Sequence, residues 1–130
     1  MKPETLIEYA IDAMGRAYAP YSGFRVGAAL LCADGSVYQG CNIENAAFSP
    51  TICAERTAFA KAVSEGQREF VAIAICGGKN GKITSVCTPC GVCRQVMAEF
   101  CKPDFQVYMV KPGGYEARTL AQLLPDSFQL

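Results

Sequence analysis

The amino-acid sequence predicts an α/β domain in which helices lie on both sides of one mixed β-sheet. Near the N-terminus, apolar residues recur at intervals of three and four, as on a helix with one buried face. Two short apolar runs then flank an Asp-Gly turn signal, as in a β-hairpin. Beyond the hairpin, helical segments alternate with apolar runs that are typical of buried strands. This order of elements favours a single sheet covered by helices.

The first helix is expected over residues 5–18, and Pro20, Ser22 and Gly23 interrupt its pattern. The hairpin strands are expected over residues 25–32 and 36–41. The N-terminal third of the chain thus predicts one helix followed by two antiparallel strands.

A second helix is expected from Pro50 to about Glu65. Ser49 can cap it, Pro50 can occupy its first position and Gly66 can end it. Cys53 then falls in the first turns of this helix.

The second half of the chain predicts four segments and a less regular end. They are a buried strand over 70–76, a loop containing Gly77, Gly78, Asn80 and Gly81, a helix over 90–101 and a strand over 105–110. Residues 115–130 predict one more short strand and a helix around 120–124.

Composition limits the class of protein. The 130 residues, 51% apolar and 10% aromatic, suffice for one core, so we expect a single domain over residues 1–130. The chain has 12 Lys plus Arg residues and 12 Asp plus Glu residues, so its net charge is zero. This absence of net positive charge disfavours binding to nucleic acid and favours a small substrate. No apolar run approaches the roughly 20 residues of a membrane span. We expect a cytoplasmic protein without a membrane partner.

Eight cysteines and no histidine define the available chemistry. Disulfide frameworks belong to small exported domains that lack a core, so reduced thiols are expected here. Five of them lie in or beside apolar runs and are expected to pack as small apolar side chains: Cys32, Cys41, Cys76, Cys87 and Cys101. Without an imidazole, Ser-His-Asp and Cys-His mechanisms are excluded.

The remaining cysteines form a candidate metal site. Cys53 stands 37 positions before the first cysteine of the Cys90-x-x-Cys93 pair, and three thiolates leave the fourth position of tetrahedral zinc open, as in catalytic sites. Glu55 lies two residues from Cys53 and can carry protons. Residues at this spacing point in nearly opposite directions on a helix side, so Cys53 and Glu55 can converge only near the helix N-terminus.

Each of these residues has a simpler interpretation. A C-x-x-C pair can be a metal site, a redox pair or a coincidence. Glu55 can be an acid favoured by the helix dipole. Arg56 can hydrogen-bond the sulfurs and offset the net negative charge of a three-thiolate zinc site, or it can be an exposed helix cation.

Together, Cys53-Ala54-Glu55-Arg56 and Pro89-Cys90-Gly91-Val92-Cys93 resemble the small homotetrameric cytidine deaminases, as do Arg25-Val26-Gly27-Ala28-Ala29 and Gly40-Cys41-Asn42-Ile43-Glu44-Asn45. The resemblance implies a three-layer α/β/α sandwich with a five-stranded mixed sheet. It also implies one Zn²⁺ per subunit, held by Cys53, Cys90 and Cys93, with Glu55 as proton shuttle. The implied reaction is hydrolytic deamination of cytidine and 2′-deoxycytidine to uridine and 2′-deoxyuridine plus ammonia, in pyrimidine salvage.

The resemblance also implies contacts to a small-molecule nucleoside. Asn42 and Glu44 match a pair that holds the ribose hydroxyls, although a solvated loop is the alternative. Phe24 matches an aromatic residue that packs on the nucleoside, with core burial as its alternative. The backbone of Ala54 is expected to contact the pyrimidine.

A homotetramer is expected by the same resemblance. Phe48 and the near-terminal Phe128 resemble aromatic residues that reach the site of a neighbouring subunit.

Three other functions stay open on the sequence alone. The chain can deaminate a different heterocycle, it can be a structural zinc module with a fourth protein ligand, or it can be a thiol redox protein that uses Cys90 and Cys93. Neither of the last two accounts for Glu55.

Overall fold

The computed structural model describes residues 1–130 and contains four helices and five strands. In chain order they are α1 (Pro3–Met14), β1 (Phe24–Cys32), β2 (Val37–Cys41), α2 (Ala54–Ser64), β3 (Phe70–Lys79), α3 (Gly91–Phe100), β4 (Gln106–Lys111), β5 (Gly114–Thr119) and α4 (Leu120–Leu123).

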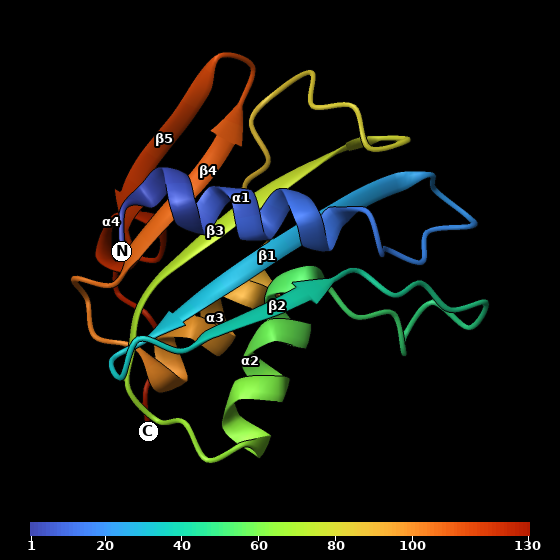
Figure 1. Cartoon of the computed structure of the whole chain (residues 1–130). Coiled ribbons are helices and arrows are strands. Elements are labelled where there is room, and N and C mark those ends of the chain that lie inside the picture. The colour runs from blue at the N-terminus through green and yellow to red at the C-terminus, as the bar shows by residue number, and fades with distance from the viewer.

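All five strands form one sheet in the order β2-β1-β3-β4-β5 (Figure 1). Strand β1 runs antiparallel to β2 and to β3, β3 runs parallel to β4, and β4 runs antiparallel to β5. The sheet is therefore mixed, which confirms the expected five-stranded arrangement.

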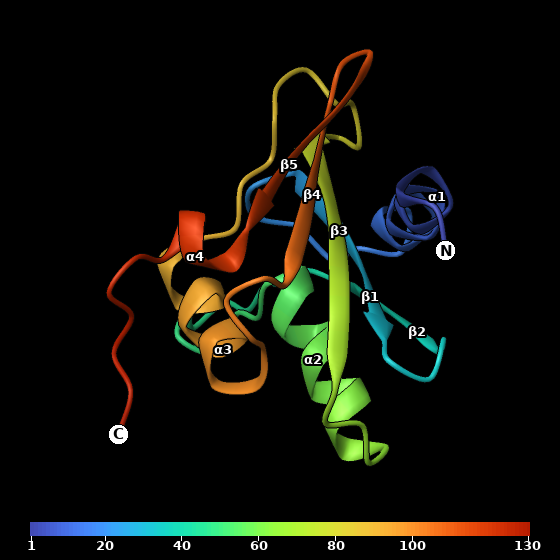
Figure 2. The same ribbon diagram turned by 90° about the vertical axis from the view of Figure 1, so that its left-hand side faces the viewer.

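Helices cover both faces of this sheet. Viewed along its edge, α1 lies on one side, and α2, α3 and α4 lie on the other (Figure 2). Successive strand residues alternate between the two faces, so each layer of helices has its own apolar cluster. The α1 cluster contains Leu6, Ala10, Met14, Ala29, Leu31, Ala72, Ala74, Cys76 and Val110. The three-layer α/β/α architecture is confirmed.

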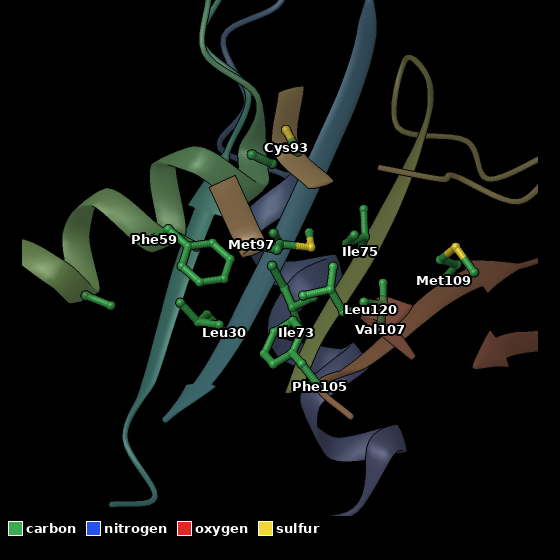
Figure 3. Packing of buried hydrophobic residues seen from close by; sticks show 14 of the residues in the cluster. Leu30, Phe59, Ile73, Ile75, Cys93, Met97, Phe105, Val107, Met109 and Leu120 are labelled. Atoms are coloured by element: carbon green, nitrogen blue, oxygen red, sulfur yellow. The ribbon is translucent and has the colours of Figure 1, made fainter. Parts of the chain in front are cut away.

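The larger cluster lies under α2 and α3 and is built around Phe59 (Figure 3). The Phe59 ring lies with its centroid 5.2 Å from that of Phe70 and 6.1 Å from that of Phe100. Cys93 belongs to the same cluster and is only 1% exposed, so the core itself fixes the position of one predicted metal ligand.

Two strand glycines let helices approach the sheet closely. A Cβ atom on Gly27 would lie 2.0 Å from the carbonyl oxygen of Ala10 in α1, and one on Gly40 would lie 2.4 Å from that of Ala54 in α2. Because Ala54 directly follows Cys53, Gly40 determines how close the start of α2 lies to β2.

Two predicted helix boundaries are wrong, because isolated β-bridges occupy these segments. Helix α1 ends at Met14, and Tyr18 instead pairs with Ile43. Helix α2 begins at Ala54 with Cys53 as its N-cap, so Ser49 and Pro50 do not start it. Ile52 exchanges two backbone hydrogen bonds of 3.0 Å with Ile43, which keeps the preceding residues extended.

The loop predicted at Gly77 and Gly78 is also wrong, because β3 continues to Lys79. Gly77 pairs with Val26 and Gly78 with Arg25. A Cβ atom on Gly78 would lie 1.7 Å from the carbonyl oxygen of Lys82, so glycine here serves close backbone packing. The expected short strand and helix near the C-terminus are confirmed as β5 and α4.

None of the helices combines the length and apolar character needed to cross a membrane.

Candidate active site

Three cysteine sulfurs meet where two helices begin. Cys53 is the N-cap of α2, Cys90 is the N-cap of α3, and Cys93 lies in the first turn of α3. The Sγ atom of Cys90 lies 3.9 Å from that of Cys53 and 3.6 Å from that of Cys93. Sulfurs about 2.3 Å from a tetrahedral zinc ion lie about 3.8 Å apart. The donor set and its spacing therefore fit zinc.

The helix starts also favour negative charge on these sulfurs, because unpaired backbone N–H groups and the positive end of the helix dipole lie there. A hydrogen bond from the Cys93 thiol, with smaller contributions from Arg56 and Cys90, lowers the pKa of Cys53 to about 5. The same hydrogen bond and burial raise the pKa of Cys93. Metal binding would release protons from these thiols, because the thiolate form is the ligand.

Glu55 is the buried acid of the site. Its side chain lies in the first turn of α2 and the residue is 4% exposed. Burial, reinforced by the charge of Cys53, raises the pKa of its carboxyl to about 7. Cys53 and Glu55 line one cavity of about 200 Å³, so the expected convergence near the helix N-terminus is confirmed.

The cavity gathers residues from several parts of the chain. Its walls come from the start of β1, the segment after β2, the start of α2 and the segment before α3. They consist of Phe24, Val26, Asn42, Glu44, Thr51, Ile52, Cys53, Ala54, Glu55, Cys87, Thr88 and Cys90. The structure therefore brings Phe24, Asn42, Glu44 and Ala54 together beside the sulfurs.

Asn42 and Glu44 are both held by hydrogen bonds, and Asn42 is buried whereas Glu44 is half-buried. The Nδ2 group of Asn42 donates to the carbonyl oxygen of Phe24 at 2.8 Å, and its Oδ1 atom accepts from the backbone N–H of Val26 at 2.9 Å. The Oε1 atom of Glu44 accepts from the backbone N–H groups of Tyr21 at 2.9 Å and Ser22 at 3.1 Å. The Ser22 hydroxyl donates to Oε2 of Glu44.

Arg56 contacts the sulfur of Cys53, as expected for a group that offsets negative charge on the thiolates. Its Nη2 group lies 3.5 Å from Sγ of Cys53, and its Nε atom is buried without a hydrogen-bond partner. This contact distinguishes Arg56 from an exposed helix cation.

Comparison with known proteins identifies the family. Residues 1–109 match the family described as "Cytidine and deoxycytidylate deaminase zinc-binding region". The chain belongs to this family. The deaminase therefore uses zinc, for which the three-cysteine cluster is suited.

Individual relatives agree with this assignment. The deaminase is 52% identical over 129 residues to the cytidine deaminase of Sporosarcina psychrophila, an alignment that covers 98% of this chain and 92% of that protein. It is 50% identical over 129 residues to the cytidine deaminase of Halalkalibacterium halodurans, covering 98% and 95% of the two chains. The crystal structure of cytidine deaminase from Burkholderia pseudomallei superposes with a TM-score of 0.91 at 46% identity, covering 98% of this chain and 100% of that one.

Phe48 and Phe128 lie outside the cavity of the deaminase. They are 74% and 70% exposed. Phe48 adopts a left-handed backbone conformation, with φ of 61°, in the turn after Asn45. The backbone oxygen of Phe128 accepts from the side chain of Gln95 at 3.1 Å. Neither ring contributes to the site of its own chain.

The sequence does not identify five residues that line the cavity of the deaminase: Val26, Thr51, Ile52, Cys87 and Thr88. Cys87 is expected from the sequence only to pack, yet it lines the cavity, and burial raises its pKa to about 12. Its position two residues before Pro89 is the available signal. Ser22 stands out in the sequence only as a residue that ends a helix, although it contacts Glu44. No pattern in the sequence indicates that contact.

Proposed function

We propose that this deaminase hydrolyses cytidine and 2′-deoxycytidine to uridine and 2′-deoxyuridine, with release of ammonia, in one catalytic domain spanning residues 1–130. The observation that carries the proposal is the buried carboxyl of Glu55, which faces the same cavity as Cys53 and Cys90. The relatives at 52% and 50% identity are cytidine deaminases, whereas the blasticidin-S deaminase of Bacillus cereus is 29% identical. Cytidine is therefore favoured over the antibiotic.

Cys53, Cys90 and Cys93 would hold the zinc ion. When bound, zinc would lower the pKa of a water molecule and so supply a nucleophile near neutral pH.

Glu55 is the proposed proton carrier. Burial raises the pKa of this carboxyl above its ordinary value, which suits a group that must both take up and release a proton near neutral pH. It takes a proton from the attacking water and delivers it to N3 of the cytosine ring. It then takes the remaining proton from the hydroxyl added at C4 and delivers it to the departing amino group. Oxygen is added to C4, the C4–N4 bond breaks, and ammonia leaves.

The other cavity residues bind the nucleoside in this proposal. Asn42 and Glu44 hold the ribose hydroxyls, Phe24 packs on the nucleoside, and the backbone of Ala54 contacts the pyrimidine. The hydrogen bonds that fix Asn42 and Glu44 support this assignment, because a preorganised polar group loses less freedom on binding. Arg56 tunes the charge of Cys53 through its contact to the sulfur.

We further propose a homotetramer in which Phe48 and Phe128 reach the sites of neighbouring subunits. The high exposure of both rings is compatible with this, because it leaves them free to contact another subunit. Sedimentation equilibrium at several concentrations tests the assembly, and a monomer at assay concentration would contradict it. A cytoplasmic role in pyrimidine salvage completes the proposal, supported by eight free cysteines.

The deciding experiment measures cytidine turnover and bound zinc in one purified sample. Conversion to uridine is followed by its ultraviolet absorbance. Zinc without turnover would favour a structural zinc module, and absence of zinc would favour a thiol redox protein.

Glu55→Gln tests the proton carrier. The variant should retain zinc, because Glu55 is not a proposed ligand, and should lose turnover by at least about a hundredfold. Glu65→Gln is the matched control, because Glu65 is exposed at the opposite end of α2. Substantial activity in Glu55→Gln would refute the assigned role.

A further inference from the structure

Ser22 links two of the residues proposed to bind the nucleoside, although it does not itself line the cavity. Its hydroxyl donates to Oε2 of Glu44, and its backbone N–H donates to Oε1 of the same carboxylate at 3.1 Å. The Ser22 Oγ atom also accepts from the backbone N–H of Phe24 at 2.9 Å. One exposed serine on the loop before β1 thus connects Glu44 with Phe24.

The chemistry of the partners fixes the direction of these hydrogen bonds. A backbone N–H can only donate, so the Ser22 oxygen must accept from Phe24. An ionised carboxylate can only accept, so the single Ser22 hydroxyl proton must point to Glu44. The chain therefore runs one way, from Phe24 through Ser22 to Glu44. In agreement, the pKa of Glu44 is lowered, chiefly by its hydrogen bond from the Ser22 side chain.

These contacts also limit what Glu44 can still bind. A carboxylate offers about four acceptor positions on its two oxygens. Tyr21 and Ser22 backbone groups use two positions on Oε1, and the Ser22 hydroxyl uses one on Oε2. The remaining position lies on Oε2, the oxygen whose orientation depends on the Ser22 hydroxyl.

Phe24 is held from both sides of its backbone. Its N–H donates to Ser22, and its carbonyl oxygen accepts from Asn42 at 2.8 Å. The three proposed nucleoside contacts, Phe24, Asn42 and Glu44, therefore belong to one hydrogen-bonded unit that Ser22 completes.

We propose that Ser22 is a positioning residue for sugar recognition, which orients Glu44 so that one acceptor of fixed direction faces one ribose hydroxyl. This rests on the proposed function of the cavity. Ser22 acts only through Glu44 and Phe24, so its effect belongs to substrate binding and not to the chemical step.

The test compares Ser22→Ala and Ser22→Cys, which remove the hydroxyl, with Ser22→Thr, which keeps it. Substrates are cytidine and 2′,3′-dideoxycytidine, which lacks the 2′ and 3′ hydroxyls and keeps the 5′ hydroxyl. For cytidine we expect KM to rise about tenfold in Ser22→Ala with kcat unchanged, since a hydrogen bond to a charged group is lost from binding alone. KM for dideoxycytidine should stay constant, and Ser22→Thr should match the wild type. Ser22→Cys carries the same test if the alanine variant does not fold.

Ser64→Ala is the matched control, because the Ser64 hydroxyl donates to the backbone oxygen of Lys61 in α2, outside the cavity. It should change neither KM. An equal rise in KM for both substrates in Ser22→Ala would show a general structural effect and overturn the proposal. An unchanged KM for cytidine would also overturn it.

A spectroscopic readout separates this proposal from the proposed function. In ¹³C-carboxyl NMR of the zinc-loaded protein, Ser22→Ala should move the titration midpoint of Glu44 upward, and Ser22→Thr should not. An unchanged midpoint would overturn the positioning role even if cytidine is turned over. Lack of turnover by the wild type would instead overturn the proposed function.

Discussion

At the scale of single residues, the site depends on where side chains lie relative to helix starts. The side chains of Cys53 and Cys90 are adjacent because each caps a helix, and Glu55 is buried in the first turn of α2. Arg56 follows within the same turn and contacts Cys53. Four neighbouring positions of one short segment therefore carry the proposed ligand, the proposed backbone contact, a buried acid and a cation.

Arg56→Ala should lower turnover or zinc affinity by about 10–100-fold, because a group that hydrogen-bonds a metal ligand adjusts the charge on it. The measurement is kcat together with zinc content after dialysis. Arg118→Ala is the control, since Arg118 lies on β5 and forms its only ion pair with Glu116. Unchanged activity and zinc content in the Arg56 variant would contradict the prediction.

The burial of Glu55 should also appear in the stability of the metal-free protein. Its folded-state pKa of about 7 exceeds the ordinary value of 4.5, so the folded protein holds the proton to higher pH than the unfolded chain. Stability is therefore lost as pH rises from the unfolded to the folded pKa. Glu55→Gln should raise the free energy of unfolding by about 3 kcal/mol near pH 8 and hardly change it near pH 4.

Urea unfolding of both metal-free proteins at the two pH values measures this difference. The same change in unfolding free energy at both pH values would show that titration of Glu55 is not its cause.

The sequence identifies residues whose type and spacing indicate their chemistry. It does not identify residues whose role depends on a contact that forms only in the folded protein. The three cysteines and Glu55 are identifiable because a chain without histidine has few side chains besides thiolates and carboxylates that can bind a metal or move a proton. Ser22 is not identifiable, because its role depends on Glu44, a residue 22 positions away, folding back onto its loop.

At the scale of elements, the strand glycines decide how closely the helices pack. Gly27 allows α1, and Gly40 allows α2, to lie directly on the sheet. Periodicity in the sequence predicts the sheet and most helices, but it places the start of α2 at Pro50. The Ile43–Ile52 bridge that overrides this helix signal is a tertiary contact, and local patterns contain no information about it.

Gly40→Ala should destabilise the protein by about 1–3 kcal/mol, the usual cost of overpacking. The added Cβ would meet backbone atoms of Ala54 and Ala58, which cannot rotate away as a side chain can. Because the helix start carries Cys53, zinc affinity should fall as well. Thermal unfolding and a competitive zinc titration measure both effects.

Gly114→Ala is the matched control, because a Cβ atom there would meet nothing within 4 Å. Equal stability of the two variants would show that α2 tolerates displacement from β2.

At the scale of the whole molecule, the metal site joins parts that the chain separates. Cys53 lies between β2 and β3, while Cys90 and Cys93 lie between β3 and β4. Cys53 and Cys90 line the same cavity. Helices α2 and α3 lie on one side of the sheet (Figure 2). Zinc would therefore link α2 to α3, while α1 packs on the opposite face.

Removal of zinc by a chelator should lower the midpoint of thermal unfolding. A ligand that binds only the folded state adds about 4 kcal/mol to the free energy of unfolding when its free concentration is a thousandfold above Kd. After zinc removal, the rate of amide hydrogen exchange should rise at the starts of α2 and α3 and stay constant in α1. Uniform acceleration across all three helices would contradict a local link.

Cobalt, which can replace zinc as a coloured probe, can report when the two segments that carry the ligands come together. A peptide containing α3 alone offers Cys90 and Cys93, but the third sulfur arrives only when α2 has docked on the sheet. The sulfur-to-cobalt absorption of a three-thiolate centre should therefore develop together with side-chain packing during refolding, after the helices themselves have formed.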